Sequence, residues 1–202
     1  MPIPFRQIRA VYDAQSIRVY QAYSHAIADS ALAHGRFVSP PFKLERMTWI
    51  KPSYLWMMYR AGWGQKDSGQ QRILAIDIRR EGFEWALTNS LLSHQGASQG
   101  DTADWQARKR ETPVRIQWDP ERDLHLAPLP HRAIQIGLSG EAVSHYVNDW
   151  ITGIHDLTAE AREVHALVQE GRLEEARTRL PVEREYLVSE ALRVHLGMDE
   201  AE

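Results

Sequence analysis

The chain alternates between two spacings of apolar residues, a period of two that is typical of strands and a period near 3.6 that is typical of helices. Short runs rich in β-branched and aromatic residues predict strands over residues 7–12, 17–21, 44–50, 72–79, 113–119 and 132–138. Asp13-Ala14-Gln15 separates the first two runs, so we expect them to form a hairpin.

Helices are predicted where apolar residues recur every three to four positions between capping signals. The predicted ranges are residues 24–34, 54–61, 81–92, 140–154, 158–170, 173–180 and 182–196. Ser24 is a good N-cap and Gly35 a good stop for the first helix. Pro52-Ser53 and Gly62 play the same parts for the second. The Ser-, Gly- and Gln-rich stretch over residues 93–104 predicts a mobile loop.

The order of these elements, mixed at first and helical at the end, favours an α+β fold over a doubly wound one. We expect a mixed, mainly antiparallel sheet with packed helices and a helical C-terminal part. A length of 202 residues with 43% apolar residues suits a single domain. Residues 1–155 would form its mixed core and residues 156–202 a helical cap.

Charge is distributed unevenly along the chain. The formal net charge is −3, which argues against a strongly basic nucleic-acid binder. Residues 43–66, however, hold five Lys or Arg against one Glu, whereas residues 156–202 hold twelve acids against six Arg. An anionic partner would therefore prefer the middle of the chain.

Several classes are disfavoured by absences in the sequence. The chain has no cysteine, so disulfides and thiolate chemistry are excluded. Its first residues lack a signal-peptide pattern and no apolar run approaches the roughly 20 residues of a membrane span. We expect a cytoplasmic monomer or homodimer that does not interact with membranes.

The densest chemistry lies in residues 46–66, where large aromatic and cationic side chains alternate with no acid between them. A strand leading into a helix at Pro52-Ser53 would bring several of them together, a combination suited to phosphate binding and ring stacking. The candidate ligand-binding residues here are Arg46, Trp49, Lys51, Arg60, Trp63 and Lys66. The alternative is that Trp56, Met57 and Tyr59 are ordinary core and the cations are solvated.

Two further stretches carry candidates. On the strand over residues 17–21, Arg18 and Tyr20 share one face and Gln21 lies on the other. At the end of the strand over residues 113–119, the secondary candidates are Gln117, Asp119, Glu121 and Arg122. Carboxylates at this spacing could hold Mg²⁺ or supply a base, but Asp-Pro-Glu-Arg is equally typical of a turn.

Familiar catalytic and nucleotide-binding signatures are missing. The sequence contains no G-x-G-x-x-G, G-x-x-x-x-G-K-[ST], H-E-x-x-H or G-x-S-x-G. Its nine histidines are dispersed, without a close pair on one helix face, so we predict no metal site.

Four blocks carry a resemblance to a known family: I-R-V-Y-Q-A-Y-S (17–24), R-M-T-W-I-K-P-S-Y-L-W-M-M-Y-R (46–60), Q-W-D-P-E-R-D (117–123) and I-Q-I-G-L-S-G-E-A (134–142). Together they resemble the domain-of-unknown-function family numbered 4291. The resemblance covers nearly the whole chain and implies a soluble single-domain protein. It brings no established activity, so it assigns no catalytic residue.

The layout of the first elements, a strand, a helix ending at Gly35 and a second strand, is similar to the start of ADP-ribosyltransferase-like domains. That similarity implies NAD as a cofactor, although the characteristic histidine of many such domains is missing.

Two function classes stay open. One is a transferase-type enzyme that binds a nucleotide-like or phosphorylated ligand in a basic and aromatic cleft. The other is a non-catalytic module that binds nucleic acid or a protein partner. A deep pocket lined by Arg46, Lys51 and Arg60 would favour the enzyme, and a flat basic face the module.

Overall fold

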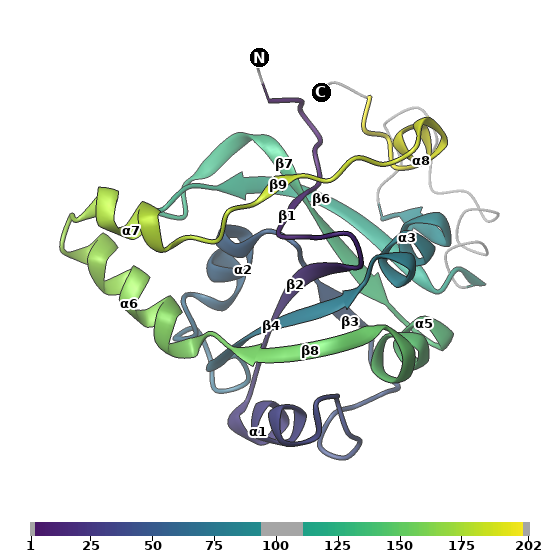
Figure 1. The fold of residues 1–202 in the computed structure, drawn as a ribbon, viewed down its shortest axis with the longest axis horizontal. Coiled ribbons are helices and arrows are strands. Elements are labelled where there is room, and N and C mark those ends of the chain that lie inside the picture. Colours follow the sequence, from purple (N-terminus) through teal and green to yellow (C-terminus); the bar gives the residue numbers. More distant parts are fainter. Residues whose placement is uncertain (1–2, 94–110, 200–202) are drawn as a thin grey trace.

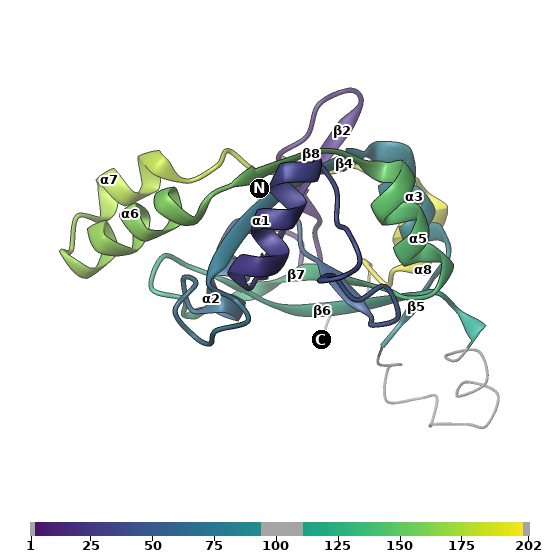
Figure 2. The ribbon, with the colours of Figure 1, turned by 90° about the horizontal axis from the view of Figure 1, so that it is seen from below.

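Two β-sheets lie face to face in the computed structural model, which describes residues 3–93 and 111–199 (Figures 1 and 2). The first sheet has the order β2 (Ser16–Tyr23), β4 (Arg72–Arg79), β8 (Ile151–Asp156). The second has the order β3 (Thr48–Ile50), β7 (Pro128–Leu138), β6 (Val114–Arg122), β5 (Ser90–Leu92). All pairs in these sheets are antiparallel except β5 with β6, so the predicted mixed, mainly antiparallel α+β fold is confirmed.

The main core fills the space between the sheets. Alternate residues of β2 and β4, such as Val19 and Ile76, face Ile116 and Ile136 of the second sheet, and all of them are buried. The other face of β4 is buried too, because Ile73 and Ala75 contact a second apolar cluster. Burial on both faces explains why β4 reads as a nearly continuous apolar run. The predicted strand over residues 72–79 is therefore confirmed.

Helices close the edges of this sandwich (Figure 2). Near one end lie α3 (Arg80–Thr88), α5 (Glu141–His145) and the short C-terminal α8 (Glu190–His195). Near the other, α6 (Thr158–Gln169) and α7 (Leu173–Arg179) form an antiparallel pair that projects from the sheets (Figure 1). α1 (His25–His34) packs near β4 and β8.

The glycine stops of the first two helices are confirmed, whereas Ser24 holds the N-cap position of α1 without a capping hydrogen bond from its side chain. Gly35 follows α1 with φ of 65°, a left-handed conformation that glycine adopts without strain. α2 (Tyr54–Ala61) begins at Ser53, whose hydroxyl accepts a hydrogen bond from the backbone N–H of Trp56. Gly62 then ends α2 in the same left-handed region. These local rules fix α2, which borders the candidate site.

Three predicted helices were too long, because strand pairing replaces their ends. The helix over residues 81–92 stops at Thr88, and Ser90–Leu92 becomes β5 beside β6. The helix over residues 140–154 ends in a π-helix, η1 (Tyr146–Trp150), before Ile151–Asp156 pairs with β4 as β8. The helix over residues 182–196 is reduced to α8, preceded by β9 (Arg184–Glu185). Neighbouring strands supply hydrogen bonds that local propensity does not foresee.

The predicted strands also needed adjustment. Only residues Thr48–Ile50 of the range 44–50 form a strand. The N-terminal hairpin was only partly right: Tyr12 and Ile17 form an isolated bridge around Asp13, but β1 (Arg9–Ala10) pairs with β9. From residue 94 onward, the predicted loop lies outside the described residues.

Within residues 3–93 and 111–199, no helix has both the length and the hydropathy to cross a bilayer.

Candidate functional site

The candidate site is a cleft at the seam where β2 and β3 diverge. A backbone bridge joins β2 to the residue after β3, where the N–H of Tyr20 donates to the carbonyl oxygen of Lys51 at 2.7 Å. Beside this bridge lies a cavity of about 480 Å³. Its polar lining comes from Gln21, Thr48, Lys51, Arg60, Gln70, Gln117 and Gln135.

Lys51 is the most unusual residue of this lining. It is only 6% exposed, and its Nζ donates to the carbonyl oxygen of Trp49 at 2.9 Å. Burial, with a smaller contribution from the charge of Arg60, lowers the pKa of Lys51 to about 7, while Asp119 acts in the opposite direction. Close to neutral pH, Lys51 can therefore exist either as an ammonium or as a free amine.

Lys51 lies in a row with two glutamines. Ile50 pairs with Ile136 across β3 and β7, so the next position along the ladder places Lys51 opposite Gln135. Gln135 in turn pairs with Gln117 on β6. The same face of this sheet thus presents one amine and two amides to the cleft. Amides both donate and accept hydrogen bonds, so this row suits a ligand with mixed polar groups.

Arg60 closes the cleft from α2, together with Met57. It lies in the last turn of the helix, where a cation is also favoured by the helix dipole. Arg60 is exposed, whereas Lys51 is buried. The two cations therefore supply an inner and an outer positive charge within one cavity.

Gln21 forms the buried end of the cleft and holds the surrounding elements together. Its amide nitrogen contacts the hydroxyls of Tyr23 and Thr48 at 2.9 and 2.8 Å. Its amide oxygen accepts from the hydroxyl of Tyr146 at 2.7 Å. The network links β2, β3 and η1, so the lining is held rigidly before any ligand arrives.

Trp49 is placed by a glycine on the neighbouring strand. It pairs with Gly137, and a Cβ added there would lie 2.9 Å from Cη2 of Trp49. Glycine is therefore required for the indole to lie across β7. This packing brings Trp49 into the cleft lining.

Arg46 lies next to the cleft rather than in it. It lines an adjoining cavity of about 340 Å³ together with Phe42, Lys43 and Gly69. Tyr23, Met47 and Thr48 line both cavities. The predicted group is thus brought together in part: Gln21, Trp49, Lys51, Arg60 and Gln117 share one cavity and Arg46 borders its neighbour.

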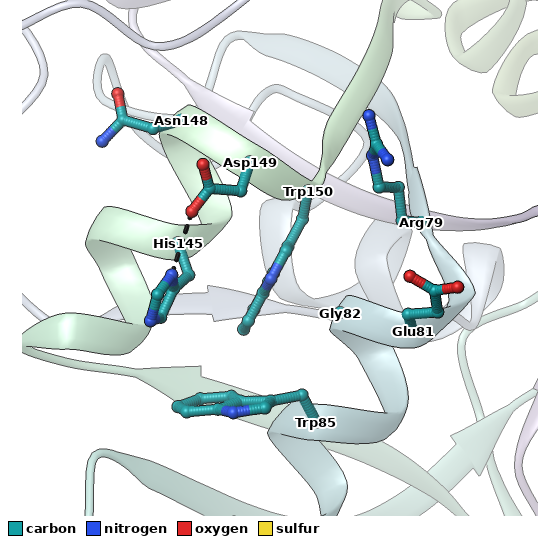
Figure 3. A pocket seen from close by; sticks show the side chains of 8 residues that line it. All are labelled: Arg79, Glu81, Gly82, Trp85, His145, Asn148, Asp149 and Trp150. Atoms are coloured by element: carbon teal, nitrogen blue, oxygen red, sulfur yellow. Dashed lines mark hydrogen bonds and ion pairs between the residues drawn. The ribbon is translucent and has the colours of Figure 1, made fainter.

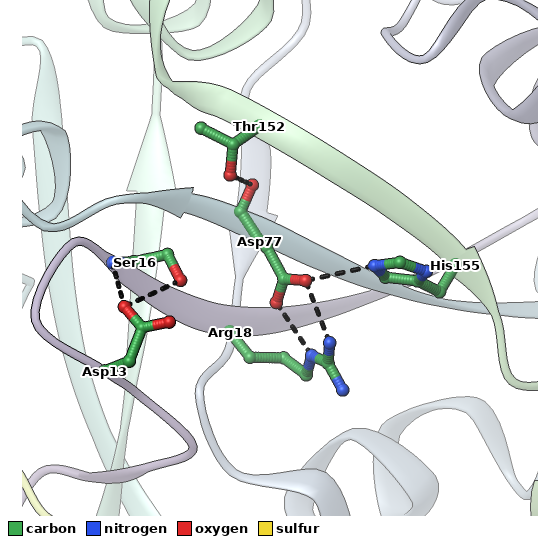
Figure 4. A network of polar contacts seen from close by, with 6 residues as sticks. All are labelled: Asp13, Ser16, Arg18, Asp77, Thr152 and His155. Carbon is green, nitrogen blue, oxygen red and sulfur yellow. Dashed lines mark hydrogen bonds and ion pairs between the residues drawn. The ribbon is translucent and has the colours of Figure 1, made fainter.

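Arg18 lies away from the cleft. As predicted, it is on the opposite face of β2 from Gln21. There its Nε and Nη2 donate to the two carboxylate oxygens of Asp77, each at 2.8 Å, and His155 contacts the same carboxylate at 3.1 Å (Figure 4). This bidentate pair occupies the groups that would hold a ligand.

Tyr20, Trp63 and Lys66 also lie outside the cleft lining. Tyr20 is fully buried beneath α2, in edge contact with Tyr54. Trp63 is 4% exposed, and its ring stacks on His165 at 5.2 Å. Lys66 is exposed. The alternative interpretation of Trp56, Met57 and Tyr59 as core holds for Trp56 and Met57, which are buried, but not for Tyr59, which is 41% exposed. Its solvated cations are right for exposed Arg46, Arg60 and Lys66 but wrong for buried Lys51.

The secondary candidates form a strand end, not the expected turn. Asp119 accepts from the amide of Gln135 at 2.5 Å, and buried Glu121 accepts from the hydroxyl of Ser53 at 2.8 Å. The guanidinium of Arg122 lies 3.6 Å from the centre of the Tyr59 ring. The turn begins later, at Asp123, whose carboxylate accepts from two backbone N–H groups.

Sequence reasoning missed Tyr23, Thr48 and Gln135. Gln135 alternates with Ile134 and Ile136, so the pattern places it on the face opposite the core. That pattern is equally typical of a solvated face, and only the seam between the sheets turns the position into a cleft wall. Among the described residues, no group of three His, Asp or Glu side chains is arranged to hold a metal ion.

Comparison with known families adds one finding. The model of the domain of unknown function DUF4291 matches residues 7–186. The chain belongs to this family. The resemblance expected from the W-I-K-P-S block and its companions is thereby confirmed, and the match includes every residue of the cleft lining. A comparison with curated proteins found no match. The family description names no activity, so the function has to be argued from the geometry of the cleft.

Proposed function

We propose that this DUF4291 protein is a transferase-type enzyme that binds a nucleotide-like, phosphorylated small molecule in the seam cleft. The observation that carries the proposal is that buried Lys51 and Arg60 line the same cavity of about 480 Å³. Two cations in one cavity suit a phosphate, and the neighbouring amides and Trp49 suit a sugar or a base.

The state of Lys51 supports a role in binding an anion. Since the pKa of Lys51 is about 7, the unliganded site holds the amine partly uncharged. A phosphate beside Nζ would favour the ammonium and draw a proton from solvent. With the phosphate bound, Lys51 is therefore charged and holds the anion. In the transfer step, the oxygen of an acceptor hydroxyl would bond to the phosphorus or to the sugar carbon while the bond to the leaving phosphate or base breaks, and the hydroxyl proton would pass to solvent.

The shape of the cleft favours this reading over a nucleic-acid or protein-binding module. Lys51 and Arg60 line a cavity, with Arg46 in the adjoining one, instead of forming one flat basic face. A cavity of this volume is within the usual range for small-molecule sites, about 300–1,000 Å³. Because the order of the first elements is similar to that of ADP-ribosyltransferase-like domains, NAD is one of the ligands to test.

Isothermal titration calorimetry with ATP, NAD and inorganic pyrophosphate tests the binding step. We expect at least one probe to bind, more tightly at pH 6 than at pH 8.5, with proton uptake visible as a dependence on buffer ionisation enthalpy. Lys51→Met and Arg60→Gln should each weaken binding by roughly tenfold or more. The matched control is Lys66→Met, which removes a cation outside the cleft.

Mass spectrometry of each probe after incubation with the protein, with and without hydroxyl acceptors, tests the transfer step. A cleaved or transferred product that is lost in Lys51→Met supports the enzyme. Binding without any product supports the non-catalytic module. Equal binding by wild type and Lys51→Met, or no binding at millimolar concentration, would remove the proposed site.

A further inference from the structure

A second cavity, of about 530 Å³, lies between α3 and the π-helix η1 (Figure 3). Its lining shares no residue with the seam cleft. The aromatic part comes from Trp85 on α3, His145 at the end of α5 and Trp150 at the end of η1. His145 and Trp150 thus stand at the two ends of the segment in which the chain passes from α-helix through π-helix to strand.

The two indoles and the imidazole of His145 pack against one another and form one corner of the cavity. The ring centres of Trp85 and Trp150 lie 5.5 Å apart with their planes inclined by 55°. The imidazole of His145 lies nearly parallel to the Trp150 ring, at 6.1 Å, and edge-on to Trp85, at 5.4 Å. Figure 3 shows all three rings around the same space.

Close backbone approach fixes this corner. Gly82 lies under the Trp150 ring, and a Cβ added there would lie 2.4 Å from Cγ of that indole. Trp150 is 7% exposed, whereas Trp85 is only half-buried and leaves part of its ring accessible. A π-turn widens the helix by one residue and is often found at functional sites. Here it carries Asn148, Asp149 and Trp150 to the cavity.

The lining of this cavity contains more carboxylates than guanidinium groups. The lining holds Glu81 and Asp149 against one guanidinium, that of Arg79. Oδ2 of Asp149 lies 2.9 Å from Nδ1 of His145, and the Asp149 side chain remains 60% exposed. In Figure 3, Glu81 and Arg79 lie on one side of Trp150 and His145 on the other. Because Trp150 is nearly covered, a ligand would rest on the accessible part of the Trp85 ring, with Glu81 and Asp149 on opposite sides of the cavity.

We propose that this corner binds a small organic cation of the alkylated ammonium class. Indole faces attract such cations through the ring quadrupole, and alkyl groups add apolar contact with the rings. Glu81 and Asp149 balance the positive charge of the ligand. An alkylated ammonium is less tightly hydrated than a bare ammonium, so it loses less hydration when it binds. An uncharged isostere of the same size keeps the apolar contact but brings no positive charge to the two carboxylates.

Titration calorimetry of the full chain with choline and tetramethylammonium tests the assignment. The uncharged carbon isostere of choline is the matched control ligand. We expect both cations to bind at millimolar concentration and the isostere to bind at least tenfold more weakly. A peptide with one trimethylated lysine is titrated in parallel, because a protein side chain and a free metabolite present the same group. Tighter binding of the peptide would assign the site to a protein partner, and tighter binding of choline to a small molecule.

Variants locate the binding. Trp85→Ala should weaken binding by roughly threefold to thirtyfold, the range of a desolvating cation–π contact. Glu81→Gln should weaken binding of the cations and leave the isostere unchanged. Leu187→Ala, a change at an exposed residue elsewhere, is the control. Because Trp85 is half-buried, each variant is first checked by thermal unfolding, and Trp85→Phe serves if Trp85→Ala does not fold.

Three results would overturn the proposal. These are equal binding of the cation and its isostere, unchanged cation binding in both Trp85→Phe and Glu81→Gln, and no binding of any cationic probe by the wild type.

Discussion

Oε1 of the Glu183 carboxyl group accepts a 2.7 Å hydrogen bond from the backbone N–H of Tyr54, in the first turn of α2. Glu121 lies beside it, bonded to the N-cap hydroxyl of Ser53. Two acids remote in sequence thus hold the start of the helix that carries Arg60 into the cleft. Burial, aided by the like charge of Glu121, raises the pKa of Glu183 to about 8 against the opposing effect of the Tyr54 bond.

Glu183→Gln should remove a pH dependence of stability. Between pH 4.5 and 8 the folded protein keeps a proton on Glu183 that the unfolded chain has lost, so its free energy of unfolding falls as pH rises. Glutamine keeps an oxygen for the Tyr54 N–H and carries no charge. We expect the free energy of unfolding of the variant to exceed that of wild type by on the order of 2 kcal/mol at pH 8.5, and by little at pH 5. Urea unfolding at both pH values measures this, and parallel curves for the two proteins would contradict it.

Lys51→Met should stabilise the protein at low pH. The folded pKa of Lys51, about 7, is below its ordinary 10.5, so folding opposes the ammonium and wild-type stability rises with pH between these values. Methionine removes the buried charge, while Gln21 still donates to the carbonyl of Trp49 at 3.2 Å. We expect the variant to be more stable by on the order of 2 kcal/mol at pH 6, with the gap closing toward pH 10. Thermal unfolding across this range decides it. A less stable variant at pH 6 would show that the ammonium bond to Trp49 outweighs desolvation.

Arg18→Met should weaken the fold without changing the cleft. The bidentate pair of Arg18 with Asp77 is partly buried, with side-chain exposures of 29% and 22%, and its loss leaves Asp77 with His155. We expect a loss of about 1 kcal/mol in the free energy of unfolding and unchanged binding of the cleft probes. Chemical denaturation and the titrations described for Lys51 measure the two effects. Weaker ligand binding at unchanged stability would place Arg18 in the site after all.

Gly82→Ala should destabilise the protein although alanine favours helices. Helix propensity alone would gain about 1 kcal/mol in the interior of α3. The new methyl would overlap the Trp150 ring, at 2.4 Å, inside a packed core, and overpacking of this kind costs about 1 to 3 kcal/mol. We expect a lower midpoint of thermal unfolding and a blue- or red-shifted tryptophan emission as Trp150 moves. The reference is wild type, because alanine at another glycine such as Gly171, with φ of 75°, would add backbone strain of its own. An unchanged midpoint would mean that the indole relaxes freely.

Much of the local structure was predictable because it depends on neighbours in the sequence. Ser53 and Gly62 bound α2 through a hydroxyl cap and a left-handed stop, both of which are set within one helical turn. The apolar run of β4 identifies a strand buried on both faces. The elements that were misjudged, β5, β8 and β9, owe their conformation to a partner strand distant in the chain.

The candidate site divides in the same way. Sequence alone determined that cations and aromatic rings are concentrated in residues 46–66, that a helix starts after Pro52, and that Arg18 and Gln21 face opposite sides of β2. Only the tertiary structure decided which of them meet. Packing two sheets around one core opens a seam beside Lys51, adds Gln135 from a remote strand, and buries Trp63 against His165. Composition fixes which groups are available, but long-range packing sets which of them lose water and which share a cavity.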